Sequence, residues 1–218
     1  MNPRSLVVFG LALYLAMPAT AHSQARYQIA VQAVGGLYIY NSENSLPLLR
    51  NGKFIGGYGI DASVIRSTDG PYGLALDVQY FRSNAKSPLT FTQTGEFGIT
   101  FHGRVALDQF SADVGVRRSL AGWLQVGLGP SIAVESRTVE IPNAGIADRL
   151  DSYCLGLNAV AAATMPFHET SNRGFFWYYT VKLRYLHSIF FDARGRDLSD
   201  YSQSFLTASL GAGIGYAF

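Results

Sequence analysis

The side chains best suited to catalysis are a neighbouring histidine and serine, His187 and Ser188, in the stretch RYLHSIFF. A histidine can activate a serine only when the two side chains meet. The surrounding residues predict a β-strand, in which adjacent side chains point to opposite faces. This pair therefore cannot form a base and nucleophile dyad by itself, and we identify no catalytic residue.

Metal or thiol chemistry has little support. Cys154 is the only cysteine, so an intramolecular disulfide is excluded. No histidine, cysteine or carboxylate lies at ligand spacing from it, and the remaining histidines, at 22, 102 and 168, show no metal-binding spacing either. We expect Cys154 to be a small apolar filler, and we expect no metal and no cofactor.

The other candidates are charged side chains within segments where apolar and polar residues alternate. In YGLALDVQY, for example, Asp77 lies on the face opposite to Leu76 and Val78. Four acidic and four basic residues share this placement: Asp61, Asp77, Asp113, Glu135, Arg117, Arg137, Lys182 and Arg184. Charges in a confined interior are tolerated when they are paired, so the balance of signs predicts a salt-bridged cluster.

Eight alternating segments would position these charges. We predict strands at 27–40, 53–66, 72–83, 103–118, 123–138, 152–166, 175–191 and 203–218. Long connections are expected at 41–52, 84–102, 139–151 and 192–202, and short ones at 67–71, 119–122 and 168–174. An even number of strands, with short turns at one end and longer loops at the other, is typical of an antiparallel up-and-down transmembrane β-barrel.

The two faces of the segments favour a membrane barrel over a soluble one. The last segment places Leu210, Ile214 and Tyr216 on one face and Gly211 and Gly213 on the other. The polar faces carry mostly Gly, Ala, Ser and Thr, which suit a narrow lumen, where a soluble barrel would carry many Lys and Glu. Charged residues make up only 15% of the chain, against roughly 25% in a typical soluble domain. Without a basic cluster, a nucleic-acid partner is excluded.

The first 25 residues predict a secretory signal peptide. Arg4 precedes the apolar run 6–17, and small residues follow, with cleavage after Ala21 or Ala25. The run is too short for a membrane-spanning helix, which needs about 20 residues. Residues 26–218 would then form the exported barrel, in the outer membrane of a Gram-negative-type cell.

The leader, the eight segments, the lumen charges and the ending GIGYAF resemble the small outer-membrane barrels of the OmpA transmembrane domain, OmpX and OmpW type. The resemblance implies that Tyr216 and Phe218 form the signal read by the barrel assembly machinery. We also expect contact with outer-membrane lipid, contact of the long, mixed-charge loops with lipopolysaccharide, and a monomer. Some such barrels modify lipid A, but the deacylases carry His and Ser two positions apart, a spacing absent here. We expect His187 to be an interfacial residue.

Three functions remain open for a barrel of this kind. The first is a non-enzymatic envelope or surface-interaction role, with a lumen plugged by salt bridges, because eight strands leave room only for side chains. The second is a narrow channel, or a conduit for small hydrophobic molecules as in OmpW-like barrels. The third, which the sequence favours least, is a lipid A-modifying enzyme.

Overall fold

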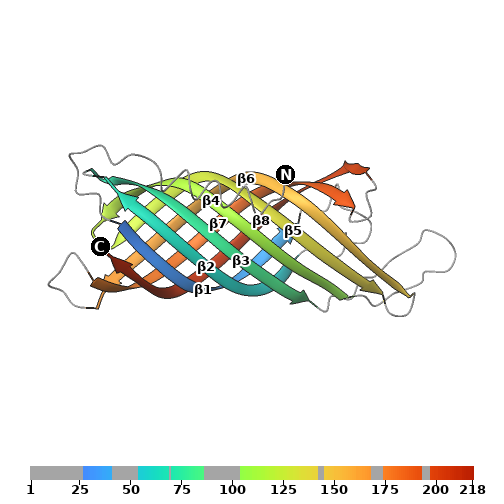
Figure 1. Cartoon of the computed structure of the whole chain (residues 1–218), viewed down its shortest axis with the longest axis horizontal. Coiled ribbons are helices and arrows are strands. Elements are labelled where there is room, and N and C mark those ends of the chain that lie inside the picture. The colour runs from blue at the N-terminus through green and yellow to red at the C-terminus, as the bar shows by residue number, and fades with distance from the viewer. Residues whose placement is uncertain are drawn as a thin grey trace.

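The chain folds into a closed barrel of eight antiparallel strands, each hydrogen-bonded to its neighbours in sequence (Figure 1). The computed structural model describes residues 27–40, 54–68, 70–85, 104–141, 145–167, 174–192 and 197–218. The strands are β1 (Tyr27–Tyr40), β2 (Phe54–Ser67), β3 (Tyr72–Ala85), β4 (Arg104–Ala121), β5 (Leu124–Ile141), β6 (Ile146–Pro166), β7 (Gly174–Asp192) and β8 (Asp197–Ala217). The predicted fold class is confirmed. The predicted signal peptide lies outside the described residues.

The last strand closes the barrel against the first. Strand β8 pairs antiparallel with β1, with Ala217 opposite Gln28 and Phe205 opposite Tyr40. The backbone N–H of Phe218 donates to the carbonyl of Tyr27 at 2.9 Å. Every described strand therefore has a partner on both sides, which a barrel in hydrocarbon requires, since lipid cannot hydrogen-bond to backbone groups.

One end of the barrel, the short-turn end, carries the connections β2–β3, β4–β5 and β6–β7. At the opposite end, the long-loop end, the prediction of long connections at 139–151 and 192–202 is wrong. Strand β5 runs to Ile141 and β6 begins at Ile146, while β7 ends at Asp192 and β8 begins at Asp197. The apolar alternation stops there, as at the exposed Arg149 and Asp151. Backbone pairing continues because a hairpin in water tolerates polar residues on both faces, and these hairpins project at the right of Figure 1.

The outer face of the barrel is an exposed apolar belt. Soluble monomers rarely expose large continuous apolar patches, so a belt on every strand marks a surface that meets lipid. Among the described residues, no helix is long and apolar enough to cross a membrane. One exposed member from each strand, in order from β1 to β8, is Val31, Ile60, Tyr80, Val114, Leu128, Leu155, Val181 and Leu210.

Glycines on the inner face make room for large side chains from neighbouring strands. A Cβ atom on Gly57 of β2 would lie 2.4 Å from the ring of Phe81, and one on Gly215 of β8 would lie 2.3 Å from the ring of Phe176. Both distances are far inside van der Waals contact. The small residues predicted to line the lumen therefore leave space for aromatic rings that extend into it.

Candidate functional site

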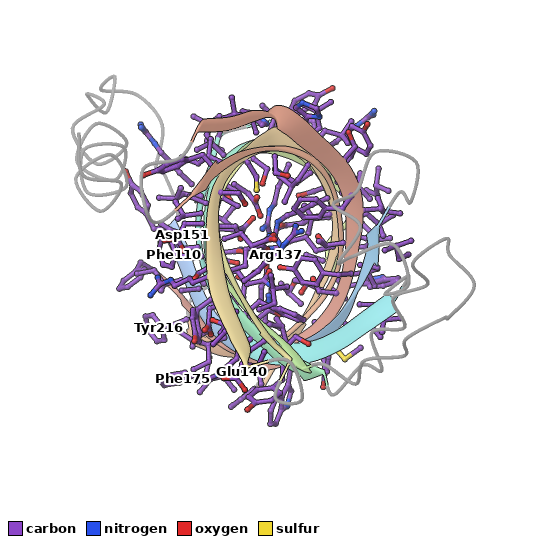
Figure 2. The ribbon with its side chains drawn as sticks, turned by 90° about the vertical axis from the view of Figure 1, so that its right-hand side faces the viewer. Phe110, Arg137, Glu140, Asp151, Phe175 and Tyr216 are labelled. Carbon is purple, nitrogen blue, oxygen red and sulfur yellow. The ribbon has the colours of Figure 1, made fainter. Side chains whose placement is uncertain are left out.

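The barrel interior gathers the charged residues singled out from the sequence. All eight side chains point inward and are at most 2% exposed: Asp61, Asp77, Asp113, Glu135, Arg117, Arg137, Lys182 and Arg184. Figure 2, a view along the barrel, shows Arg137 inside the ring of strands, while Phe110, Phe175 and Tyr216 point outward. The inward direction follows from strand parity, since residues two apart share a face.

Arg117 of β4 is held by an acid and a phenol. Its Nη2 donates to both carboxylate oxygens of Asp77, at 2.6 and 2.7 Å, and its Nη1 donates to the hydroxyl of Tyr178 on β7. The hydroxyl of Ser63 on β2 also donates to Asp77. Asp77 thus accepts hydrogen bonds from a guanidinium and from a hydroxyl, and bonds of this charge-assisted kind are the stronger ones in proteins.

Lys182 of β7 is the centre of the network. Its Nζ pairs with Oδ2 of Asp61 and lies 3.8 Å from Oδ2 of Asp77 and 3.7 Å from Oδ2 of Asp113. The three carboxylates come from the consecutive strands β2, β3 and β4, on the far side of the lumen from β7. One ammonium thus joins three acids that the sequence places at similar distances from their turns.

Arg184, also on β7, completes this group by pairing with Asp113 of β4. Its Nε lies 3.0 and 2.9 Å from the two carboxylate oxygens, and its Nη2 lies 2.6 Å from Oδ2. The hydroxyl of Ser131 donates to the same carboxylate. Three acids and three bases then balance, which is the arrangement that makes buried charge tolerable.

A separate ion pair lies closer to the long-loop end. Arg137 and Glu135 are two residues apart on β5 and pair through Nε and Oε1. Gln109 of β4 donates from Nε2 to Glu135 Oε2 at 3.3 Å, and the Arg137 guanidinium carbon lies 5.8 Å from the centre of the Phe205 ring. This pair is also neutral overall, so the eight charges sum to zero in two balanced groups.

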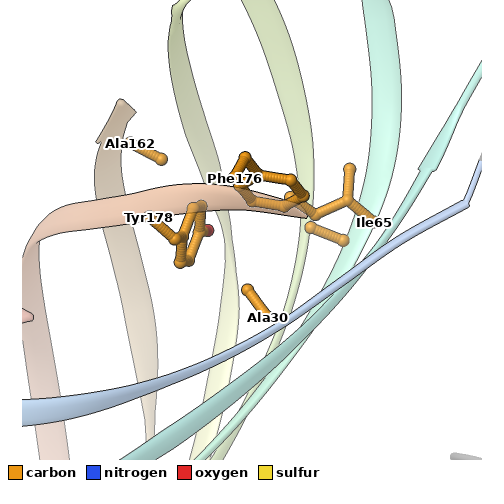
Figure 3. Close-up of a cluster of buried hydrophobic side chains, with 6 residues drawn as sticks. Ala30, Ile65, Ala162, Phe176 and Tyr178 are labelled. Atoms are coloured by element: carbon orange, nitrogen blue, oxygen red, sulfur yellow. The ribbon is translucent and has the colours of Figure 1, made fainter. Parts of the chain in front are cut away.

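Apolar layers lie on both sides of the six charged residues around Lys182. At the short-turn end, Ala30, Ile65, Ala75, Ala162, Phe176 and Tyr178 form a buried cluster (Figure 3). Toward the long-loop end, Tyr38 packs on Phe81 and Phe205 with ring centres 5.1 and 5.8 Å apart. Leu107 and Leu186 are fully buried as well. The six charged residues around Lys182 therefore lie between two layers of apolar side chains, and Arg137 of the second ion pair contacts Phe205 in one of these layers.

The sequence interpretation gave these lumen-facing aromatics no role, although their position along each strand already indicates the face on which they lie. Phe176 and Tyr178 stand on the same face of β7 as Lys182, and Phe81 stands on the same face of β3 as Asp77. Most residues on the polar faces are small, so the few large rings there were given no weight. Tyr178 matters most because its hydroxyl is a direct partner of Arg117.

The two side chains considered for catalysis point to opposite faces of β7. His187 is exposed on the outer face, with Nδ1 3.0 Å from Oγ of Ser204, whereas Ser188 is fully buried in the lumen. Cys154 is buried beside Ser152, with the sulfur 3.8 Å from its hydroxyl oxygen. Among the described residues, no three potential metal ligands cluster. His22, His102 and His168 fall outside the described ranges.

The closed barrel and its apolar belt define a small eight-stranded outer-membrane β-barrel, so the chain is a protein of the outer membrane. No family model matches the sequence, and no curated protein matches it. The likeness lies in the fold.

Solved structures with this fold include Ail, the attachment invasion locus protein of Yersinia pestis, at 7% identity and a TM-score of 0.54, covering 89% of this chain and 99% of that one. Ail has also been solved in complex with the heparin analogue sucrose octasulfate, and that structure matches at 8% identity and a TM-score of 0.53, with the same coverage. A major outer membrane protein from Thermus thermophilus matches at 17% identity and a TM-score of 0.51, also with 89% and 99% coverage.

Proposed function

We propose that this chain is a non-enzymatic outer-membrane barrel whose lumen is closed by side chains, and that it acts in the envelope or in surface interactions. The observation that carries the proposal is the neutral charge network between two apolar layers. An ion crossing the lumen would have to separate buried ion pairs and also pass through apolar layers, and both steps are costly in a low-dielectric interior.

Conductance across a planar bilayer tests the closed lumen. We expect the refolded wild-type protein to give no steps and liposomes containing it not to swell in small sugars. Replacing Tyr38, Phe81 and Phe205 by alanine together removes one barrier and leaves the ion pairs and the apolar cluster at the short-turn end in place. This triple variant should therefore stay silent, like Phe110→Ala, which removes a ring from the outer face. Steady conductance by the wild-type protein would contradict the proposal.

A narrow channel is the second candidate, and the position of Lys182 favours it. Because this ammonium lies within 4 Å of three carboxylates, exchange of partners could rearrange the network without a net change in charge. On this alternative the wild-type protein conducts, and Asp77→Asn or Arg184→Gln changes the conductance. A conduit for small hydrophobic molecules would instead accelerate their uptake into liposomes while remaining electrically silent.

The proposal includes the absence of enzymatic activity, which lipid A analysis tests. His187 and Ser188 lie on opposite faces of β7, so they form no dyad. His187 does meet Ser204 of β8 on the outer face, with Nδ1 3.0 Å from Oγ, so the proposal also requires that His187→Ala and Ser204→Ala leave lipid A unchanged. Mass spectrometry of lipid A should give the same profile with and without the gene. A change in acylation that depends on the gene would overturn this part of the proposal.

We also propose that Tyr216 and Phe218 are read by the barrel assembly machinery, and that the assembled chain is a monomer in contact with lipid and lipopolysaccharide. Both rings lie on the outer face near the short-turn end, with centres 5.1 Å apart, and Tyr216 packs on Phe175 at 5.0 Å. Phe218→Ala should lower the amount of folded barrel in the outer membrane. Phe175→Ala, which removes a neighbouring ring outside the final segment, should not.

A further inference from the structure

The outer face of the barrel has an apolar groove of about 560 Å³ across strands β5, β6 and β7. Ala159 and Ala161 of β6 lie in it between larger side chains on either side, Val126 and Leu128 on β5, and Val181 and Leu183 on β7. An alanine methyl between branched side chains leaves a hollow. Apolar atoms that border an unfilled hollow lose their dispersion contacts, so the groove favours a flexible apolar occupant.

One end of this groove is basic. Arg118 of β4 and Tyr72 of β3 also line it, near the short-turn end. The two residues are direct cross-strand partners, and the Arg118 guanidinium carbon lies 5.8 Å from the centre of the Tyr72 ring. Arg118 is exposed, and in the part of the chain that the structure describes it makes no salt bridge.

The outer face carries charges of both signs toward the long-loop end, where Arg82 pairs with Asp108 and Arg149 with Asp151, and, among the described side chains, arginines toward the short-turn end. Over the described ranges, the carboxylates exposed on the outer face are those of Asp108, Glu140 and Asp151, all toward the long-loop end. Arg66, stacked on its cross-strand partner Tyr27, and Arg118 lie toward the short-turn end. The short turns of such barrels face the periplasm, so Arg66 and Arg118 lie at the headgroup level of the inner leaflet.

We propose that the groove binds an anionic phospholipid of that leaflet, with one acyl chain along Ala159 and Ala161 and the phosphate against Arg118. The acyl chain supplies the apolar, flexible occupant that the hollow fits. The arginine supplies the charge that attracts an anionic headgroup at a membrane surface. An arginine at this level can extend its stem along the apolar surface and keep its guanidinium at the interface. The inference does not depend on whether the lumen conducts.

Native mass spectrometry of the full chain, refolded in detergent, tests the site. Phosphatidylglycerol and phosphatidylcholine with identical acyl chains are the probes. We expect the wild-type barrel to retain one phosphatidylglycerol about fivefold better than phosphatidylcholine, the preference that one basic residue contributes near a charged surface. Arg118→Gln should abolish the preference. Arg66→Gln is the matched control, because Arg66 has the same stacking on tyrosine but does not line the groove, and it should keep the preference.

A second variant separates the groove from the charge. Ala161→Phe fills the hollow on the lipid face while leaving Arg118 in place, and it should lower the retention of both lipids. The gel shift of unboiled samples checks that each variant is folded. If Ala161→Phe does not fold, the comparison of Arg118→Gln with the wild type decides the test. Equal retention of the two lipids by the wild type would overturn the proposal, as would equal effects of Arg66→Gln and Arg118→Gln. So would a dimer that excludes lipid, since a second copy would then occupy the groove.

Discussion

Lys182→Met is the substitution that should most strongly perturb the lumen. It keeps the length of the side chain and removes the ammonium that neutralises Asp61, whose carboxylate is fully buried and pairs with no other cation described. Removing one partner of a buried ion pair costs about 3–5 kcal/mol, because the remaining charge is left without compensation. The loss should lie toward the upper end of this range, since Asp77 and Asp113 also lose a nearby positive charge.

Urea unfolding in lipid vesicles, followed by tryptophan fluorescence, measures this cost. The double variant Asp61→Asn with Lys182→Met restores neutrality, so it should be more stable than Lys182→Met alone, with a coupling of about 1–3 kcal/mol. Arg82→Gln is the control, because the Arg82–Asp108 pair is 3.6 Å long and about half exposed on both sides. It should cost less than about 1 kcal/mol. Equal costs for Lys182→Met and Arg82→Gln would refute the reasoning, as would strict additivity in the double variant.

Other predictions concern side-chain packing in the lumen and the backbone hydrogen bonds of β5. Gly215→Ala should destabilise the barrel by about 1–3 kcal/mol through overlap with Phe176, whereas Gly122→Ala, at a turn where a Cβ atom meets nothing within 4 Å, should change the urea midpoint little. Tyr178→Phe removes the hydroxyl bonded to Arg117 and keeps the ring, so it should cost about 1–3 kcal/mol in the same assay; an unchanged midpoint would contradict the assigned contact. Asn158 donates from Nδ2 to the carbonyls of Gly129 and Pro130 at 3.0 and 3.1 Å. Because Pro130 has no N–H for the ladder, Asn158→Ala should speed amide hydrogen exchange in β5 near this point more than at its ends.

The predicted strands were accurate where lipid acts on one face and the lumen on the other. In β3 the alternation from Tyr72 to Tyr80 marks the span, and the structure begins that strand at Tyr72. The predicted strand limits were wrong beyond the apolar belt, where β6 begins at Ile146 and not at residue 152. Past the membrane, no apolar environment selects one face, so the side-chain pattern disappears while the backbone ladder continues.

The direction of each charged side chain is a local property of a strand, since parity along Tyr178, Thr180, Lys182 and Arg184 decides it before any folding. The sequence by itself thus determined an antiparallel barrel with an apolar outside and balanced charges inside. Which acid meets which base was decided only by closure of the barrel. Lys182 reaches Asp61, 121 positions earlier in the chain, because the tilt and stagger of the strands bring β7 opposite β2. The aromatic layers also depend on closure, since Tyr38, Phe81 and Phe205 meet only when three strands curve around a common axis.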